Sequence, residues 1–381
     1  MKLEAFIPAV VLLCFGVMLG LKSSCALQMG KESRNYISWA DFRVVENGRL
    51  ERRIFSVKED KSNSVNTNAN ANAKNATSVE RTIVVDKNGR GDSVTVQGAV
   101  DMVPKSNSQR VKIFILPGIY REKVRVPRSK PYISFIGNES CVEETVISWN
   151  DKASDLDSNG NELGTWRTAS VFIESNFFCA TAITFENTVV AEAGESGMQA
   201  VALQVSGDKA VFYKVRVLGS QDTLFDDNGS HFFYQSYIQG NVDFIFGNGK
   251  SLYQDCHIHS TAKTVGAIAA HHRDSPTEDT GFSFVNCDIN GTGKVYLGRA
   301  WGNYSRTVYS NCFIADIITR VGWSDWQDPK RQRTAMFGEY NCRGRGAARG
   351  GRAPWTKTLT RAEVKPFLSR EFIYGNQWLR L

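Results

Sequence analysis

Apolar residues recur through the second half of the chain in a six-residue pattern. An aromatic residue is followed by two variable residues, a small residue, a variable residue and an aliphatic residue, with valine once in the small position. The aromatic members are Phe178, Phe212, Phe233, Tyr253, Phe284 and Tyr309, and the aliphatic members are Ile183, Val217, Ile238, Ile258, Ile289 and Ile314. Repeats spaced this irregularly are typical of a solenoid whose loops differ in length. We expect each repeat to form one coil of a parallel β-helix, with the aromatic side chains stacked in its core.

The sequence before these repeats favours the same architecture. Short β-rich runs occupy residues 81–86, 111–116, 132–136, 171–173 and 201–205, and Gly, Asn, Asp and Ser residues cluster between them. Residues 93–103 are the best early helix candidate and would cap one end of the solenoid. Near the C-terminus, Thr360-Arg-Ala-Glu363 resembles a capping box that opens a helix through Leu368 and packs back on the solenoid. The predicted fold class is therefore all-β, a single-stranded parallel β-helix with short capping helices.

The N-terminal region predicts a different organisation. Residues 1–26 are typical of a secretory signal peptide, with Lys2 near the start, an apolar run over 6–21 and Ser24-Cys25-Ala26 as cleavage site. A membrane anchor is the alternative, but the apolar run is short for a span and no second run follows. Residues 27–80 are predicted to be a flexible N-terminal segment, because 62–78 form an Asn/Ala/Ser-rich linker. Residues 81–381 then form the β-helix domain.

Composition and charge agree with a secreted, soluble protein. Hydrophobic residues make up 42% of the chain and charged residues 22%, and the formal net charge is +7. Such a modest positive charge favours retention in a polyanionic matrix such as a cell wall. Nucleic acid is a poor partner, because a secretory signal argues against access to it. Glycosylation sequons at Asn75, Asn138, Asn228, Asn290 and Asn303 are consistent with secretion.

Cysteine usage leaves two alternatives open. Removal of residues 1–26 would leave six cysteines, and no CxxC spacing indicates a metal site. Cys256, Cys287 and Cys312 share the small position of the repeat. We expect them to form a stack of buried thiols in the core. A Cys256–Cys287 disulfide between adjacent coils is the alternative.

Two aspartates occupy the same phase of the repeat. Asp222 lies ten residues after Phe212, and Asp243 lies ten residues after Phe233. Equal phase on neighbouring strands of a β-helix places the two carboxylates about 5 Å apart. Aspartates are common at the corners of solenoids, so each alone would be a structural residue. Two like charges this close are costly, however, and the pair predicts a site that needs them.

Further polar residues complete a candidate acyl-transfer site. Gln199 opens Gln199-Ala-Val-Ala-Leu203 about one coil earlier, Gln221 precedes Asp222, and Arg299 lies in Leu297-Gly-Arg-Ala-Trp301. Together these residues supply amide donors and a fixed cation beside the two carboxylates. A serine hydrolase is disfavoured, because the chain has no G-x-S-x-G elbow and its five histidines have no adjacent nucleophile motif.

Five motifs in order resemble the blocks of the plant pectin methylesterases. They are Gly118-x-Tyr120-x-Glu122, Gln199-Ala-Val-Ala-Leu203, Gln221-Asp-Thr-Leu224, Asp243-Phe-Ile-Phe-Gly247 and Leu297-Gly-Arg299-x-Trp301. The resemblance extends from about Thr82 to the C-terminus. It implies a right-handed parallel β-helix that hydrolyses the methyl esters of homogalacturonan to pectate and methanol, without a metal or organic cofactor.

The resemblance also implies a role for each site residue. Asp243 would be the nucleophile that attacks the ester carbonyl and forms an aspartyl acyl-enzyme. Asp222 would protonate the departing methanol and then activate water. The other expected roles are oxyanion donors for Gln199 and Gln221, a partner of Asp243 for Arg299, and sugar contacts for Trp301, Phe246 and Trp323.

The expected partners follow from the same family. They are methyl-esterified pectin and a proteinaceous pectinesterase inhibitor, with no nucleic acid and no membrane once the signal is cleaved. We expect a monomeric enzyme in the plant cell wall. The region before residue 81 is too short for the inhibitor-like pro-region that many relatives carry, so the chain resembles the short branch of the family.

The chain departs from the family pattern at four positions. Ala300 replaces a usual proline, Ser220 a common aromatic residue, Phe225 a usual tyrosine and Gln204 a usual arginine. The residue types with chemical roles are kept. The changes therefore bear on substrate contacts and strand rigidity rather than on the reaction.

Two other functions are compatible with this fold. Carboxylates about 5 Å apart also suit a retaining glycosidase that cleaves the polygalacturonate backbone, but the chain has no motif set typical of such enzymes. A catalytically silent wall-binding solenoid would use the same groove. Methanol release from pectin without chain shortening distinguishes the esterase from both.

Overall fold

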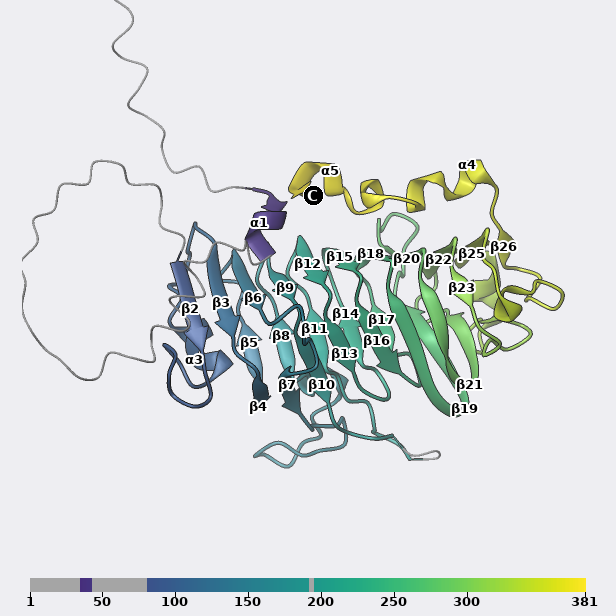
Figure 1. Cartoon of the computed structure of the whole chain (residues 1–381). Coiled ribbons are helices and arrows are strands. Elements are labelled where there is room, and N and C mark those ends of the chain that lie inside the picture. Colours follow the sequence, from purple (N-terminus) through teal and green to yellow (C-terminus); the bar gives the residue numbers. More distant parts are fainter. Residues whose placement is uncertain (1–34, 43–80, 192–194) are drawn as a thin grey trace, which may run out of the picture. The chain divides into compact units, whose positions relative to one another are not determined.

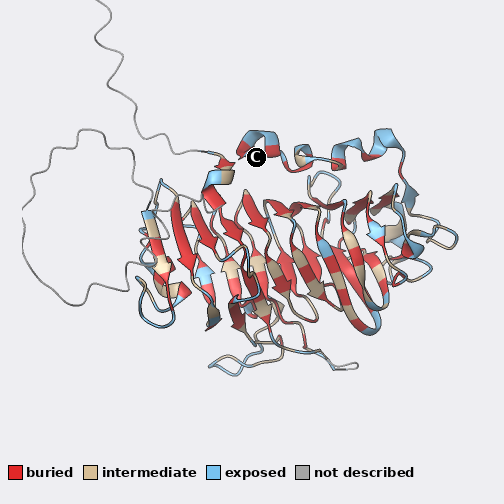
Figure 2. Cartoon of the chain, in the orientation of Figure 1, coloured by how far each residue is buried: buried red, intermediate tan, exposed pale blue. Residues whose placement is uncertain are grey.

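The computed structural model describes residues 35–42, 81–191 and 195–381. Within this part of the chain, successive coils stack so that named strands pair in parallel with their counterparts one coil away (Figure 1). Buried residues follow the strands along the whole stack (Figure 2). The predicted parallel β-helix is confirmed.

The strands form three faces. The first face consists of β2 (Arg81–Val85), β3 (Val111–Ile115), β6 (Ile133–Ile136), β9 (Cys179–Thr181), β12 (Ala210–Tyr213), β15 (Ser230–Tyr234), β18 (Lys250–Gln254), β20 (Gly281–Val285), β22 (Arg306–Ser310), β25 (Met336–Tyr340) and β26 (Lys357–Thr358). The second face consists of β4 (Gly118–Arg121), β7 (Thr145–Trp149), β10 (Thr184–Asn187), β13 (Arg216–Leu218), β16 (Tyr237–Gly240), the starts of β19 (His257–His271) and β21 (Asp288–Arg299), and β23 (Phe313–Ile314). The third face consists of β5 (Val124–Val126), β8 (Val171–Ile173), β11 (Leu203–Val205), β14 (Leu224–Asp226), β17 (Ile245–Gly247), the ends of β19 and β21, and β24 (Trp323–Ser324).

One residue per coil turns the chain sharply from the first face to the second. Lys214, Gln235, Asp255, Asn286 and Asn311 each follow a first-face strand and have φ angles of 50°, 51°, 54°, 56° and 55°. Left-handed backbone costs little for Asn and Asp, whose short side chains hydrogen-bond locally. These corners explain why the second residue after the repeat aromatic is polar in the five repeats that begin with Phe212, Phe233, Tyr253, Phe284 and Tyr309.

The predicted aromatic core is confirmed for five of the six repeats. Phe212, Phe233, Tyr253, Phe284 and Tyr309 are in register, fully buried and stacked, with ring centroids 4.6, 4.8, 4.6 and 4.5 Å apart. Offset ring stacking of this kind contributes about 0.5–1.5 kcal/mol per pair beyond burial.

The first repeat was assigned two residues too early. Ala180, not Phe178, pairs with Phe212, and Phe185, not Ile183, pairs with Val217. Phe178 is still fully buried in the same core, so its apolar character reflects burial rather than its position in the repeat.

The cysteines of the small position are buried free thiols, as predicted, and the alternative disulfide is not found. Each thiol donates a hydrogen bond to the carbonyl of the repeat aromatic one coil earlier. The bonds run from Cys256 to Phe233, Cys287 to Tyr253, Cys312 to Phe284 and Cys342 to Tyr309, at 3.3–3.5 Å. The thiols therefore link neighbouring coils without a covalent bond.

The early helix lies where it was predicted. Helix α3 (Val96–Asp101) has Thr95 as its N-cap, and its buried residues cover the N-terminal end of the core. Glu122 accepts hydrogen bonds from the backbone N–H groups of Val96 and Gln97 at 2.8 and 2.9 Å. A carboxylate at a helix N-terminus satisfies free donors and complements the helix dipole, so Glu122 supports the structure.

The C-terminal capping box is also confirmed. Thr360 and Glu363 cap each other at the start of α4 (Arg361–Val364), which continues as the 3₁₀ helix η4 (Lys365–Phe367). After it come η5 (Arg370–Ile373), α5 (Gly375–Trp378) and β27 (Leu379–Arg380). This segment runs back along the coils, and its buried residues pack on the outer side of the first face (Figure 1). The remaining 3₁₀ helices are η1 (Thr165–Arg167), η2 (Pro329–Arg333) and η3 (Arg345–Ala347).

Residues 35–42 correct the prediction of a flexible N-terminal segment. Strand β1 (Ile37–Ser38) pairs with β27, and the following helix α1 (Trp39–Phe42) buries Phe42 completely against the first face. Asp41 forms a buried ion pair with Arg110 at 3.2 Å. We call these eight residues the N-terminal strap. The segment is too short to show a recognisable hydrophobic period, so the sequence did not predict it.

The predicted signal peptide and the Asn/Ala/Ser-rich linker lie outside the described residues. In residues 35–42, 81–191 and 195–381, no helix has the length and apolarity needed to cross a membrane.

Candidate active site

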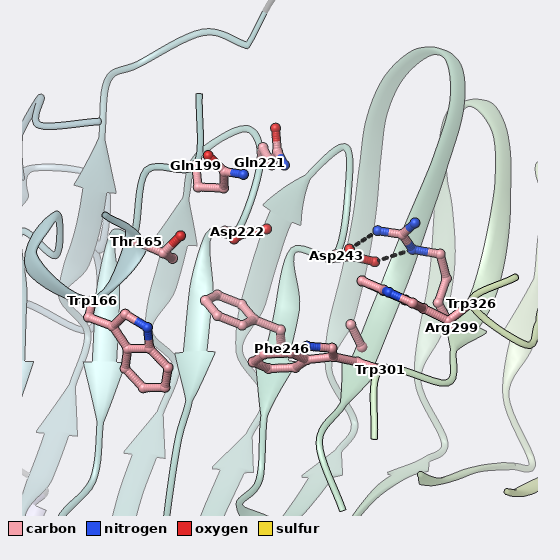
Figure 3. Close-up of a pocket in the computed structure, with 11 residues that line it drawn as sticks. Thr165, Trp166, Gln199, Gln221, Asp222, Asp243, Phe246, Arg299, Trp301 and Trp326 are labelled. Atoms are coloured by element: carbon pink, nitrogen blue, oxygen red, sulfur yellow. Dashed lines mark hydrogen bonds and ion pairs between the residues drawn. The ribbon is translucent and has the colours of Figure 1, made fainter. Parts of the chain in front are cut away.

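A cavity of about 290 Å³ opens on the third face. It crosses several coils, from Trp166 in η1 to Trp301 and Trp326 beyond β21 (Figure 3). Its lining comprises Thr165, Trp166, Gln199, Gln221, Asp222, Asp243, Phe246, Ala270, Arg299, Trp301 and Trp326. Seven of the eight predicted site residues therefore meet in one cavity.

Asp222 and Asp243 are neighbours across adjacent coils. Gln221 bridges Val242 and Leu224 pairs with Ile245, so the two aspartates share one register. Each precedes its strand by two residues and has a left-handed φ, 59° for Asp222 and 47° for Asp243. This conformation costs about 1–3 kcal/mol for most residues, although aspartate tolerates it better. The turn points both carboxyl groups into the cavity.

Arg299 holds only one of the two aspartates. Its Nε donates to Oδ1 of Asp243 at 2.8 Å, and its Nη2 donates to Oδ2. The side chain of Asp243 is 8% exposed, which makes this bidentate pair largely desolvated. On its other side the guanidinium lies over the ring of Trp326, with Cζ 4.0 Å from the centroid. The cation is therefore fixed from both sides.

The two carboxyl groups differ in proton affinity. Burial, together with the charge of Asp243, raises the pKa of Asp222 well above its ordinary value, and Arg299 opposes this only in part. Burial also raises the pKa of Asp243, but the hydrogen bonds and charge of Arg299 act directly against that rise. When the pair holds one proton, that proton resides on Asp222.

Gln199 and Gln221 bring two amide groups to the same end of the cavity as Asp222 (Figure 3). The backbone carbonyl of Gln221 accepts from the N–H of Ala200 at 3.1 Å, which ties the two coils together beside the amides. Neutral amides placed next to a buried carboxyl pair are suited to stabilise negative charge that develops on a substrate oxygen.

Aromatic side chains form the apolar part of the cavity. Phe246 stacks on Phe225 at a centroid distance of 4.5 Å, and Trp166 meets Phe225 edge-on at 4.6 Å. At the other end of the cavity, the ring centroid of Trp301 lies 6.0 Å from that of Phe246. Trp166 is 57% exposed, unusual for tryptophan, so a flat apolar surface is open to a ligand.

The prediction that Trp323 contacts sugar is wrong. Trp323 is 2% exposed, and its ring Nε1 donates to the buried carboxylate of Glu339 at 3.1 Å. It belongs to the main core and does not line the cavity, whereas Trp326 does. Side chains alternate along a strand, and Ser324, not Trp323, pairs with the outward Arg299.

Sequence reasoning missed Thr165, Trp166 and Ala270 as cavity residues, and it preferred Trp323 to Trp326. Thr165 and Trp166 lie in η1, which has no repeat, and only the fold brings that segment to the cavity. Ala270 was open to prediction, because it occupies the same row as Phe246 on the neighbouring strand.

The positions that depart from the family pattern have clear structural surroundings. Ser220 Oγ accepts hydrogen bonds from Ala191 N and Asn241 Nδ2 at 3.1 and 2.9 Å, so it ties loops together. Ala300 N–H donates to Ser324 O at 2.9 Å, a bond that a proline could not form. Phe225 stacks on Phe246, and Gln204 pairs with Phe225 between β11 and β14.

Among the described residues, no group of three or more His, Cys, Asp or Glu side chains is arranged to hold a metal ion. The site consists of one arginine-bound carboxyl group, one carboxyl group whose pKa is raised by burial, and two amides. It is suited to nucleophilic acyl transfer with acid–base assistance.

Comparison with known proteins agrees with this arrangement. The family model for pectinesterases matches residues 82–376. Pectinesterase QRT1 of Arabidopsis thaliana is 82% identical over 383 residues, which cover 100% of both chains. The pectin methylesterase from carrot is 34% identical with a TM-score of 0.72, covering 80% of this chain and 96% of the carrot chain. The corresponding enzyme from Aspergillus niger is 25% identical with a TM-score of 0.67, covering 80% and 97%.

The chain belongs to the pectinesterase family. It is a carboxylic ester hydrolase, as the sequence motifs predicted, and its β-helix is that of the solved pectin methylesterases.

Proposed function

We propose that this chain hydrolyses the methyl esters of homogalacturonan through an acyl-enzyme on Asp243. The observation that carries the assignment is the asymmetry of the carboxyl pair. Arg299 binds Asp243 directly, whereas among the described residues no ion pair or hydrogen bond reaches the carboxyl group of Asp222. A carboxylate held ionised beside a carboxyl group held protonated supplies a nucleophile and an acid in one cavity.

The first half of the reaction releases methanol. An Asp243 oxygen attacks the C6 ester carbonyl, and the oxyanion that forms faces the amides of Gln199 and Gln221. The C–O bond to the methoxy group then breaks while the proton of Asp222 moves to that oxygen. Asp243 is left as a mixed anhydride with the uronate, and Asp222 is left ionised.

The second half restores the enzyme. Asp222, now a base, takes a proton from water, and the hydroxide attacks the C6 carbon of the acyl-enzyme. Asp243 departs as a carboxylate that Arg299 stabilises, and Asp222 again carries a proton. The products are the uronic acid unit, which ionises in solvent, and the enzyme in its starting state.

The aromatic ends of the cavity fit the sugar units on either side of the reacting ester. Phe246 and Trp301 offer apolar faces against which pyranose rings pack, and Trp166 and Trp326 extend that surface in both directions.

The deciding experiment measures methanol release and chain length together on methylated pectin. We expect methanol without shortening of the polymer, and Asp243→Asn should lower kcat by at least about 10⁴-fold, as removal of a nucleophile does. Asp255→Asn is the matched control, because Asp255 also occupies a left-handed coil corner, on another face. Full activity of Asp243→Asn would remove the nucleophile assignment, and shortened chains would favour a glycosidase.

The cellular setting is part of the same proposal. Residues 1–26 would direct secretion, and a monomer would act on cell-wall pectin. A proteinaceous inhibitor would bind across the cavity and block the substrate. N-terminal sequencing of protein recovered from the apoplast tests the first point, and an N-terminus at Met1 would contradict it.

Among the sequons, Asn138, Asn228 and Asn303 are exposed and available for glycosylation. Asn290 is half-buried within β21, where its Nδ2 donates to Asp288 at 2.9 Å. We expect a glycan at the exposed positions and none at Asn290, which mass spectrometry of glycopeptides would show.

A further inference from the structure

The interior of the β-helix contains a polar cluster directly behind the cavity, and the proposed reaction does not use it. Asp226, the last residue of β14, points inward, as do His231 on β15 and Tyr253 on β18. All three side chains are fully buried. The residue that pairs with Asp226 on the preceding coil is the apolar Val205. Polar residues at these inward positions are therefore specific to this section of the core. We call Asp226, His231 and Tyr253 the internal network.

The internal network is closely connected. Asp226 Oδ1 lies 2.5 Å from His231 Nδ1, and the hydroxyl of Tyr253 donates to Asp226 Oδ2 at 2.5 Å. His231 Nε2 lies 3.0 Å from the carbonyl oxygen of Gly207. Every polar atom of the three side chains therefore has a partner, as a buried polar group requires.

The contacts fix where the protons lie. Because Nε2 of His231 faces a carbonyl, which only accepts, Nε2 carries a proton. Nδ1 faces a carboxylate oxygen, so a second proton lies between Nδ1 and Oδ1. Without it, a carboxylate would face a ring lone pair in a dry core, an arrangement that costs several kcal/mol.

The backbone leaves room for the internal network. A Cβ atom added to Gly249 would lie 2.3 Å from Asp226 Oδ1, and one added to Gly229 would lie 2.9 Å from His231 Nε2. Residues without side chains therefore occupy the two places where the chain passes closest to the buried pair.

The internal network joins the three coils that carry the reacting groups. We count a coil here from the turn before one third-face strand to the turn before the next, so Gly207 lies in the coil that begins with Gln199. Asp226 and His231 belong to the coil of Gln221 and Asp222. Tyr253 belongs to the coil of Asp243. Each hydrogen bond between coils therefore links one section of the candidate active site to the next.

We propose that Asp226, His231 and Tyr253 are positioning residues, which set the relative placement of the coils that carry Gln199, Asp222 and Asp243. This inference rests on the proposed roles of those residues. Parallel strand pairing fixes the spacing of coils, but a β14 segment of three residues offers few ladder bonds to fix tilt and rotation. The internal network supplies that constraint from the inside. Misplacement by about 1 Å in an active site costs about 10²-fold in rate.

Variants of graded severity test the proposal. Tyr253→Phe keeps the ring and removes one donor. Asp226→Asn keeps hydrogen bonds to both partners, because its amide can donate to a neutral His231 and accept from Tyr253. Asp226→Ala removes both. We expect kcat on methylated pectin to fall about 10- to 100-fold in Asp226→Ala and least in Asp226→Asn, with KM nearly unchanged.

Asp41→Asn is the matched control, since Asp41 is a buried carboxylate paired with Arg110 on the outer side of the first face. It should lower the melting temperature without lowering kcat. Each kcat is divided by the folded fraction, measured by circular dichroism at the assay temperature. If Tyr253→Phe and Asp226→Ala lower the melting temperature but keep the kcat of the folded fraction, the network is only structural and the proposal is overturned.

The same outcome leaves the proposed reaction intact, because that depends on the loss of activity in Asp243→Asn. Conversely, an active Asp243→Asn enzyme would overturn the reaction and with it the inference. Should Asp226→Ala fail to fold, Tyr253→Phe, which preserves side-chain volume, decides alone.

Discussion

Asp222 and Asp243 occupy equivalent positions on neighbouring coils, yet only Asp243 is bound by Arg299. The parallel ladder makes their backbones alike, and both residues have a left-handed φ. The difference between the proposed acid and the proposed nucleophile therefore arises from one cation that a later coil delivers through β21. Two aspartates with equivalent backbone positions in a repetitive β-helix therefore differ in their side-chain environment.

Replacing Asp222 should separate activity from stability. Asp222→Asn is expected to lower kcat by about 10²- to 10⁴-fold, because it cannot donate or accept the transferred proton. The pKa of Asp222 is higher in the folded protein than in the unfolded chain. The fold therefore loses stability as pH rises from the unfolded pKa to the folded pKa, because the unfolded chain releases this proton more easily. Asn removes that cost, so the melting temperature at neutral pH should rise. A melting temperature that falls there, or an unchanged kcat, would contradict the assignment.

Removing the cation should move the acidic limb of the pH profile. The nucleophile must be ionised, so activity falls as pH falls through the pKa of Asp243. Burial raises this pKa and Arg299 opposes the rise. Arg299→Gln should therefore shift the acidic limb of kcat/KM to higher pH, and Arg299→Lys should shift it less, because the charge remains. A limb that stays in place in Arg299→Gln would show that Arg299 does not control the ionisation of Asp243.

The amide groups should contribute mainly to the transition state. Gln199→Ala and Gln221→Ala are each expected to lower kcat by about 10²- to 10³-fold while KM changes little. Gln204→Ala is the control, because Gln204 is a neighbouring amide that does not line the cavity. An equal loss in Gln204→Ala would mean that the effect is structural.

Two tryptophans should respond in opposite ways. Trp166→Ala should raise KM on polymeric pectin several-fold and leave the melting temperature nearly unchanged, because the side chain is exposed at the cavity. Trp323→Phe should lower the melting temperature without changing KM, because it leaves the buried Glu339 without its Nε1 donor. Steady-state kinetics and thermal denaturation distinguish these outcomes. A raised KM in Trp323→Phe would show that Trp323 contacts the sugar after all.

The N-terminal strap should stabilise the fold without taking part in the reaction. Phe42 is fully buried beside Trp39 and Tyr213, with ring centroids 5.1 and 5.7 Å away. Phe42→Ala should lower the free energy of unfolding by about 3–5 kcal/mol. Methanol release by the folded enzyme should stay at the wild-type rate. Chemical denaturation measures the first quantity, and a loss below about 1 kcal/mol would show that the strap is dispensable.

The fold was predictable because each coil of the β-helix corresponds to one sequence repeat. Aromatic, small and aliphatic residues at fixed spacing report directly on which side chains enter the core, and the phase of Asp222 and Asp243 placed them side by side. The first repeat was misassigned because Phe178 and Phe185 both face the core, and spacing alone cannot tell which of two buried aromatics is in register.

The parts that sequence did not predict depend on contacts between distant segments. Trp323 faces the core because of the register of β24 with β21, whereas Trp326 lies beyond β24, has a left-handed φ of 59° and lines the cavity. Trp166 reaches the cavity from the short 3₁₀ helix η1, which lies outside the repeat. The N-terminal strap has no repeat of its own, because its partners are β27 and the outer side of the first face.

The unequal lengths of the coils have a consequence for the evolution of specificity. Insertions accumulate in the turns, while the ladder keeps its pitch of about 4.8 Å whatever the turns contain. New loops can therefore reshape what the enzyme recognises along a polymer, and the separation of its two carboxyl groups stays constant. The loops that contact the polymer can therefore change in evolution while the spacing of the two carboxyl groups is kept.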